Sequence, residues 1–253
     1  MSFAHYPSLE NAVVYITGGA AGIGLEMVRA FAAQGAHVGF VDISAEAGRA
    51  LADEMTRDGA KVHFEACDLT DIDALKAAFA KLKQAFGPAA VLVNNAARDD
   101  RHGWEDVTPE YYDERIATNL RHMFFAIQAV APDMIAAGKG SIINFSSNSW
   151  HQAVGGMPVY TTSKAAVHGM TRSFARDLGK HRIRVNTIVP GWVMTERQKT
   201  LWASPEAIER QLARQCLPDL IDPIYLARMA LFLASDDSAM CTANNYMVEA
   251  GSI

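Results

Sequence analysis

The chain has 253 residues, half of them hydrophobic, and its 23 basic and 28 acidic residues give a formal net charge of −5. This length suffices for one large hydrophobic core, and the lack of a basic excess argues against a nucleic-acid-binding protein. The three widely spaced cysteines form no Cys-x-x-Cys pair, which argues against a disulfide framework and indicates a reducing cytoplasm.

The N-terminal segment and the hydropathy pattern indicate where the protein works. Residues 1–12 lack the basic and apolar regions of a secretion signal, and no apolar run approaches the ~20 residues that a membrane-spanning helix needs. We therefore expect a cytoplasmic protein that acts on small molecules, binds neither membranes nor nucleic acid, and has no metal site.

In chain order, short apolar runs alternate with longer helical patterns. The expected strands are Val13–Thr17, His37–Asp42, Lys61–Ala66, Ala90–Asn94, Ser141–Phe145, Ile183–Val189 and Asn245–Val248. The expected helices are Ile23–Gln34, Ala45–Asp58, Asp71–Phe86, Pro109–Ala137, Val159–Lys180 and Asp222–Ala234. Most strands are continuously apolar, which suits a sheet covered on both faces. The pattern predicts an α/β fold: one Rossmann-type domain over residues 1–253, with a doubly wound parallel sheet of about seven strands and helices on both faces.

One stretch departs from this alternation. Residues 192–223 contain several prolines and a short expected helix near Glu206–Gln215. An insertion of this length inside a compact domain is more often functional than a simple connection, so we expect a substrate lid.

The first expected strand runs directly into TGGAAGIG (residues 17–24), and a helix follows. Gly18, Gly22 and Gly24 permit a tight turn that lets backbone N–H groups approach a pyrophosphate, and the helix N-terminus adds partial positive charge. A glycine cluster alone is a weak signal. Its place between a strand and a helix predicts a dinucleotide-binding loop.

Acidic residues end or follow the next two strands. Asp42 can accept hydrogen bonds from both ribose hydroxyls, whereas a 2′-phosphate would meet like charge, so we expect NAD rather than NADP. The alternative is that Asp42 merely caps the helix that begins near Ser44. Asp68 is placed either to meet the adenine edge or to cap the following helix.

Tyr160 and Lys164 lie four residues apart at the start of an expected helix, so both side chains share one face. The chain has seven tyrosines, so a Tyr-x-x-x-Lys match can arise by chance, and the pair is informative only together with other residues of the site. Ser147 follows the fifth strand, and Asn119 interrupts the long helix before that strand. A free tyrosine, with a pKa of about 10, is a poor base, and we expect Lys164 and a positive nicotinamide to lower that pKa.

These residues together resemble the short-chain dehydrogenase/reductase family over essentially the whole chain. The matching elements are TGGAAGIG at 17–24, Asp42, Asp68, Asn94-Asn95-Ala96, Asn119, Ser147, Tyr160, Lys164 and Pro190-Gly191. One departure is visible, because the family's usual Asn-Asn-Ala-Gly reads Asn-Asn-Ala-Ala here. Ala97 affects the loop on the nicotinamide side but removes no catalytic group.

The resemblance implies a role for each residue of the site. Tyr160 takes the proton of the substrate hydroxyl as a hydride leaves for the nicotinamide, and Ser147 hydrogen-bonds the same oxygen. Asn119 holds a water that links Lys164 to solvent. The implied cofactor-binding residues are Gly18, Gly22, Ile23, Gly24, Asp42, Ile43, Asp68, Leu69, Asn95, Ala96, Ala97, Tyr160, Lys164, Pro190, Gly191, Val193 and Thr195. Relatives are commonly homotetramers built on the long helices after strands four and five, so a homotetramer is expected.

Three segments should border the substrate pocket, namely residues 97–104, 148–158 and 191–223. They hold all four tryptophans together with charged and amide side chains, which suits a polyhydroxylated substrate. Longer stretches, among them 143–151 and 190–198, resemble bacterial aldose 1-dehydrogenases of the D-xylose, L-arabinose or D-galactose type. This implies oxidation of the anomeric hydroxyl of a cyclic sugar to a lactone with NAD. The candidate sugar contacts are Asn148, Trp150, His151, Met157, Trp192 and Arg197.

Three other functions stay open at this point. A polyol or other secondary-alcohol dehydrogenase, or ketone reductase, of the same family would use the same catalytic residues. A ketoacyl reductase would usually want NADP and a basic docking patch, and Asp42 and the net charge of −5 argue against both. A catalytically silent NAD-binding sensor would have little use for Asn119, Ser147, Tyr160 and Lys164 together.

Overall fold

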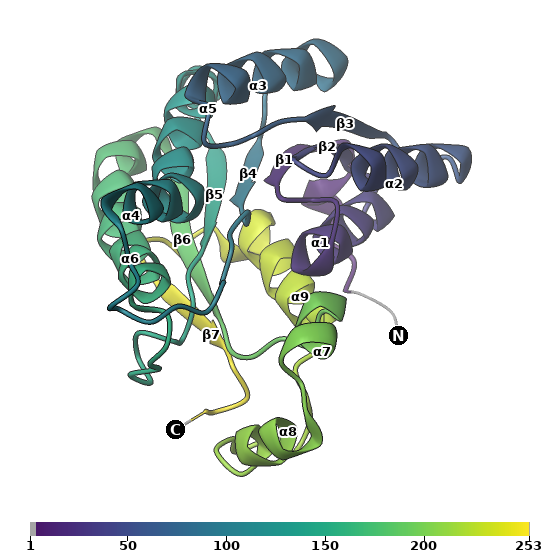
Figure 1. The fold of residues 1–253 in the computed structure, drawn as a ribbon. Helices are drawn as coiled ribbons and strands as arrows, with labels where there is room; N and C mark the ends of the chain where they lie inside the picture. Colours follow the sequence, from purple (N-terminus) through teal and green to yellow (C-terminus); the bar gives the residue numbers. More distant parts are fainter. Residues whose placement is uncertain (1–3, 253) are drawn as a thin grey trace.

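The computed structural model describes residues 4–252, and in them one parallel sheet lies between two layers of helices (Figure 1). The strands are β1 (Val13–Thr17), β2 (His37–Asp42), β3 (Val62–Ala66), β4 (Val91–Asn94), β5 (Gly140–Phe145), β6 (Ile183–Pro190) and β7 (Asn245–Val248). Their order is β3-β2-β1-β4-β5-β6-β7, and every pairing is parallel. The predicted doubly wound sheet of seven strands is confirmed.

The helices divide between the two faces of the sheet. They are α1 (Gly22–Ala33), α2 (Ala45–Arg57), α3 (Ile72–Phe86), α4 (Pro109–Ile116), α5 (His122–Ala137), α6 (Pro158–Leu178), α7 (Glu196–Leu201), α8 (Pro205–Leu212) and α9 (Pro223–Ala234). On one face, Phe31 of α1 and Leu231 of α9 are buried in one apolar cluster with Ile16 of β1. On the other, Leu75 of α3 and Ile127 of α5 are buried in a second cluster. Both faces of the strands are therefore covered, as their continuous apolar sequences predicted.

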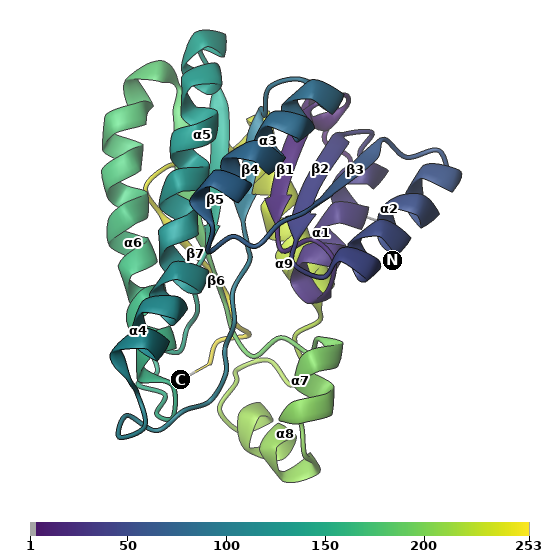
Figure 2. The same ribbon diagram turned by 45° about the horizontal axis from the view of Figure 1, so that its top comes forward.

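The strand order fixes where ligands can enter. The chain builds β1, β2 and β3 outward in one direction and then returns to place β4 on the other side of β1. The loops after β1 and β4 therefore leave the sheet in opposite directions, and a crevice forms beyond the carboxyl ends of these two strands. Helices α7 and α8 and the long loop between β4 and α4 lie beyond this same edge (Figure 2).

The helical stretch expected over Pro109–Ala137 is interrupted at Asn119, as the sequence indicated, although a π-helical turn was not predicted. A π-helical turn, Ala117–Arg121, separates α4 from α5, and Asn119 lies in it. The Oδ1 atom of Asn119 accepts a hydrogen bond of 2.8 Å from the backbone N–H of Arg98, which belongs to the loop after β4. A partner outside the helix favours this wider turn, and the local sequence gives no sign of such a partner.

The stretch 192–223 holds two short helices, whereas one was expected near Glu206–Gln215. Helix α8 overlaps that expectation, and Ser204 caps its N-terminus. Helix α7 was missed, although Thr195 and Gln198 form the Thr-x-x-Gln pattern of a capping box and the Thr195 hydroxyl accepts from the Gln198 N–H.

No helix within residues 4–252 is both long and apolar enough to cross a membrane. Across the same residues, no three His, Cys, Asp or Glu side chains gather into a group that could hold a metal ion.

Candidate active site

A cavity of about 740 Å³ lies beyond the carboxyl ends of the strands. Its walls come from the glycine loop, from the ends of β2 to β6, and from the α7–α8 segment. The predicted residues that line it are Gly18, Gly22, Ile23, Asp42, Ile43, Asp68, Leu69, Asn95, Ala96, Ala97, Ser147, Asn148, Met157, Tyr160, Lys164, Pro190, Gly191, Trp192, Val193, Thr195 and Arg197. Gly24, Asn119, Trp150 and His151 are absent from the walls.

The glycine loop is packed so closely that side chains would not fit. Gly18 has a φ of +70°, and a Cβ there would lie 2.8 Å from the Cα of Ala96. A Cβ on Gly24 would lie 1.8 Å from the carbonyl oxygen of Gly18, so this glycine serves the packing of the loop on α1. The Nδ2 atom of Asn95 donates to the carbonyl oxygens of Thr17 (3.1 Å) and Gly18 (2.9 Å). Asn95 thus ties the glycine loop to the loop after β4.

Asp42 is hydrogen-bonded to the glycine loop as well as to the start of the next helix. Its Oδ2 accepts from the Ala20 N–H (3.0 Å) and its Oδ1 from the Ser44 N–H (2.9 Å). A residue that only capped α2 would not need the hydrogen bond from Ala20, so Asp42 does more than cap that helix. The carboxylate lies at the wall of the cavity next to Ile43, whose side chain is 70 % exposed.

Asp68 also lines the cavity, and it does not cap the helix that follows. Its Oδ1 accepts from the N–H (2.9 Å) and the hydroxyl (2.8 Å) of Thr70. Asp71 caps α3, because its side chain accepts from two N–H groups of the first turn. Of the two readings left open by the sequence, the cap is therefore wrong for Asp68.

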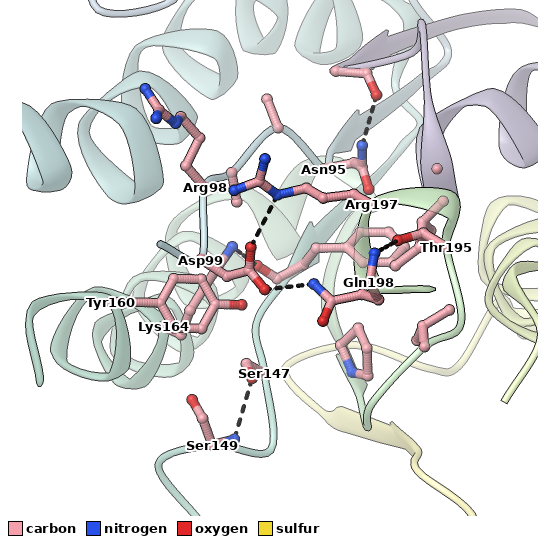
Figure 3. A pocket seen from close by; sticks show the side chains of 18 of the residues that line it. Asn95, Arg98, Asp99, Ser147, Ser149, Tyr160, Lys164, Thr195, Arg197 and Gln198 are labelled. Atoms are coloured by element: carbon pink, nitrogen blue, oxygen red, sulfur yellow. Dashed lines mark hydrogen bonds and ion pairs between the residues drawn. The ribbon is translucent and has the colours of Figure 1, made fainter. Parts of the chain in front are cut away.

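Tyr160 and Lys164 lie one turn apart on α6 and face the same cavity (Figure 3). The Nζ atom of Lys164 lies 5.8 Å from the centre of the Tyr160 ring. It donates a hydrogen bond of 2.9 Å to the carbonyl oxygen of Phe145, at the end of β5. Lys164 is almost fully buried, so the apolar wall around it disfavours its charged form.

Burial dominates the acidity of both groups. It raises the pKa of Tyr160 to about 12, an effect that the charge of Asp99 increases and that a hydrogen bond with Ser147 and the charge of Arg101 partly oppose. Burial also lowers the pKa of Lys164 to about 7. We expect Lys164 and a positive nicotinamide together to lower the pKa of Tyr160, and the groups of the chain alone leave that pKa raised. A half-neutral lysine supplies little charge, and a phenolate here needs a further positive charge beside the ring.

Ser147 lines the cavity beside this pair, whereas Asn119 is buried away from its walls. The hydroxyl oxygen of Ser147 accepts from the N–H of Ser149 (3.1 Å), which fixes it beside Tyr160. Asn119 is fully buried behind the loop after β4, and its Nδ2 atom is a buried donor without a protein partner. A donor buried without a partner is costly, so Asn119 is a position that needs a role.

The six candidate sugar contacts fall into two sets. Asn148, Met157, Trp192 and Arg197 line the cavity. Trp150 and His151 lie outside its walls: the Trp150 indole N–H donates to Nε2 of His168 (3.1 Å), and the His151 side chain is exposed.

Two further residues line the cavity, and the sequence did not single them out for substrate. Asp99 and Gln198 come from segments that are almost a hundred residues apart, and Gln198 Nε2 donates to Asp99 Oδ2 at 2.6 Å. Both lie within the three segments expected to border the pocket. The capping box at Thr195 was the available signal that Gln198 sits on an ordered helix.

Comparison with known proteins places this geometry in context. The family described as enoyl-(acyl carrier protein) reductase matches residues 18–252. D-xylose 1-dehydrogenase of Caulobacter vibrioides is 48 % identical over 251 residues, which cover 99 % of this chain and 99 % of that protein. A Rhizobium meliloti protein named "Probable galactose dehydrogenase GalD" is 46 % identical and is covered over 97 % of its length, with 98 % of this chain.

Among solved structures, a 7α-hydroxysteroid dehydrogenase complexed with NADH and a 7-oxo bile acid matches with a TM-score of 0.93. The two chains are 31 % identical, and the match covers 100 % of this chain and 98 % of that one. The likeness extends across the sheet and its connections and leaves no part of the fold without a counterpart.

Proposed function

We propose that this chain, which belongs to the short-chain dehydrogenase/reductase family and is an oxidoreductase, uses NAD to oxidise the anomeric hydroxyl of an aldose to the lactone. One observation supports the substrate class above all others: two sugar dehydrogenases are 46–48 % identical to the chain over nearly its whole length. The cavity lined by Tyr160, Lys164 and Ser147 supplies the chemistry that this reaction needs.

The cofactor fits the residues that are present. Gly18 and Gly22 line the cavity without side chains that would block a pyrophosphate, and α1 begins at Gly22, so its N-terminal N–H groups lie beside them. Ile43 offers an exposed apolar surface to an adenine ring, and Asp42 offers a carboxylate to the ribose. Pro190, Gly191, Val193 and Thr195 would border the nicotinamide. We assign NAD rather than NADP because Asp42 would repel a 2′-phosphate.

In the proposed mechanism Tyr160 accepts the proton of the anomeric hydroxyl while a hydride leaves the anomeric carbon. NAD, when bound, would supply the hydride acceptor and, in its oxidised form, a positive charge. Ser147 donates a hydrogen bond to the substrate oxygen and stabilises its developing charge. Without added positive charge Tyr160 has a pKa of about 12, so near neutrality almost none of it is the phenolate that can accept a proton.

The proton then needs a route to solvent. Lys164, with a pKa of about 7, can exchange a proton near neutrality, and its Nζ lies close to the Tyr160 ring. We propose that the unpaired Nδ2 donor of Asn119 holds a water that continues this route. Asn119 lies in the π-helical turn, which sets the position of its side chain.

The α7–α8 segment is proposed as the lid over the substrate, with Asn148, Met157, Trp192 and Arg197 as sugar contacts. Trp150 and His151 would join them only if residues 148–157 moved when sugar binds. We also propose a cytoplasmic homotetramer. Phe124 of α5, which is 44 % exposed and lies 5.1 Å from the Phe174 ring of α6, gives an apolar surface on the two long helices that such an assembly would cover.

NAD reduction by the purified protein tests this proposal. D-xylose, L-arabinose and D-galactose are compared with the matching polyols, the product is identified by NMR, and light scattering gives the mass of the assembly. We expect aldoses to be oxidised to lactones and polyols to react poorly. Oxidation of polyols with no activity on aldoses would replace the proposal with a polyol dehydrogenase of the same family.

A further inference from the structure

Asp99 brings a carboxylate to the wall of the cavity beside Tyr160 (Figure 3). It lies on the loop between β4 and α4, and 23 % of its side chain is exposed. Its charge raises the pKa of both Tyr160 and Lys164, so it acts on the two groups that handle the proton. A negative charge at this point opposes formation of the phenolate. The Asp99 carboxylate therefore has a role other than proton transfer.

The lid holds this carboxylate in one orientation. Gln198 of α7 donates from Nε2 to Oδ2 of Asp99 at 2.6 Å, and its Oε1 accepts from the indole N–H of Trp192 at 2.8 Å. Because the amide oxygen is engaged by Trp192, the NH₂ group must face Asp99. Gln198 is only 9 % exposed, so this arrangement is well shielded from solvent.

The other carboxylate oxygen is less occupied. Oδ1 of Asp99 has a long contact of 3.5 Å with Nε of Arg197. The Nη2 atom of Arg197 pairs more closely with Asp100, at 2.6 Å. An ionised carboxylate can accept about four hydrogen bonds, and the chain supplies Asp99 with one short bond and one long one. The remaining acceptor sites of the Asp99 carboxylate lie at the cavity wall and suit a ligand rich in hydroxyl groups.

We propose that Asp99 accepts a hydrogen bond from the substrate hydroxyl on the carbon next to the reacting carbon, and that Gln198 is the positioning residue that orients it. The inference rests on the proposed function. Tyr160 meets the reacting hydroxyl, and in a cyclic aldose the donor nearest to that hydroxyl is the one on the adjacent carbon. An alcohol without that donor leaves the carboxylate unpaired, so Asp99 selects polyhydroxylated substrates.

The test pairs each enzyme variant with two substrates. The aldose that the wild-type protein oxidises best is compared with its 2-deoxy analogue. Asp99→Asn should lower kcat/KM for the aldose about 10- to 100-fold and change it for the 2-deoxy sugar by less than about threefold. Gln198→Ala should give the same selective loss with a smaller factor, chiefly through KM. Thermal melting of each variant checks that it folds.

Asp100→Asn is the matched control, because Asp100 lies on the same loop and pairs with Arg98, Arg115 and Arg197 but does not line the cavity. Any loss that it causes should be equal for the two sugars. An equal loss on both sugars for Asp99→Asn would overturn the role of Asp99 while leaving the aldose activity in place. A wild-type protein that oxidises no aldose would instead remove the proposed function itself.

Discussion

Replacement of Asp42 by alanine tests the basis of cofactor choice. The carboxylate is fixed by hydrogen bonds from the Ala20 and Ser44 N–H groups, so its position is defined before any ligand binds. A 2′-phosphate about 5 Å away would meet a repulsion of roughly 3 kcal/mol at an effective dielectric constant near 20, which is about 100-fold in affinity. Loss of ribose hydrogen bonds should weaken NAD use about tenfold. The ratio of kcat/KM for NAD over NADP should therefore fall by about three orders of magnitude in Asp42→Ala.

Steady-state kinetics with each cofactor at saturating sugar measures this ratio. Asp42→Asn is the informative companion, because it keeps one acceptor oxygen and removes the charge. It should recover part of the NAD affinity while still admitting NADP. Asp58→Asn, a change at the exposed end of α2, should leave the ratio unaltered. A ratio that stays the same in Asp42→Ala would refute the electrostatic argument, since nothing else in that variant could restore the repulsion.

The remaining predictions concern proton transfer, buried charge and loop packing. Tyr160→Phe should keep NAD affinity, measured by fluorescence titration, while kcat falls about 10²- to 10⁴-fold; ordinary turnover would remove Tyr160 from the mechanism. Lys164→Met should be compared with the wild type by urea unfolding between about pH 7 and pH 10. The pKa of Lys164 is about 7 in the folded state and 10.5 in the unfolded state. Burial of the lysine therefore destabilises the fold fully below about pH 7, and this cost disappears as the pH rises to 10.5. The wild type should therefore gain stability relative to the variant as the pH rises through that range, and a flat difference would contradict the burial argument. Gly24→Ala should lower the melting temperature sharply, because its Cβ would overlap the Gly18 carbonyl, whereas Gly179→Ala, whose Cβ meets no neighbour and whose φ is −59°, should cost far less; similar melting temperatures for the two would contradict the packing argument.

The sheet was predictable because its information is local. Apolar runs mark most of the strands, and the glycines between β1 and α1 mark the turn where a nucleotide would bind. The spacing of Tyr160 and Lys164 likewise places both on one face of α6. Each of these features depends on neighbours within a few residues, so a single sequence contains it.

The features that escaped prediction depend on distant partners. The π-helical turn at Asn119 is accompanied by a hydrogen bond to the backbone of Arg98, and Asp99 meets Gln198 only after the chain has crossed the sheet. Burial and the charge of Asp99 raise the pKa of Tyr160, and the local sequence around Tyr160 reveals neither of them. The direction of Trp150, toward His168 on α6, also follows from packing that no periodicity reveals.

The ion pairs that join Arg197 to Asp99 and Asp100 carry a lesson for engineering. One half of the sheet supplies the nucleotide loop, and the other half and α7 supply the alcohol side, which invites the transplantation of new selectivity from a relative by exchange of residues 192–223. Such a graft alone would bring a foreign helix against carboxylates that Arg197 and Gln198 hold in place here. The loop after β4, which holds Asp99 and Asp100, should therefore be exchanged together with residues 192–223 if the hybrid enzyme is to keep its turnover.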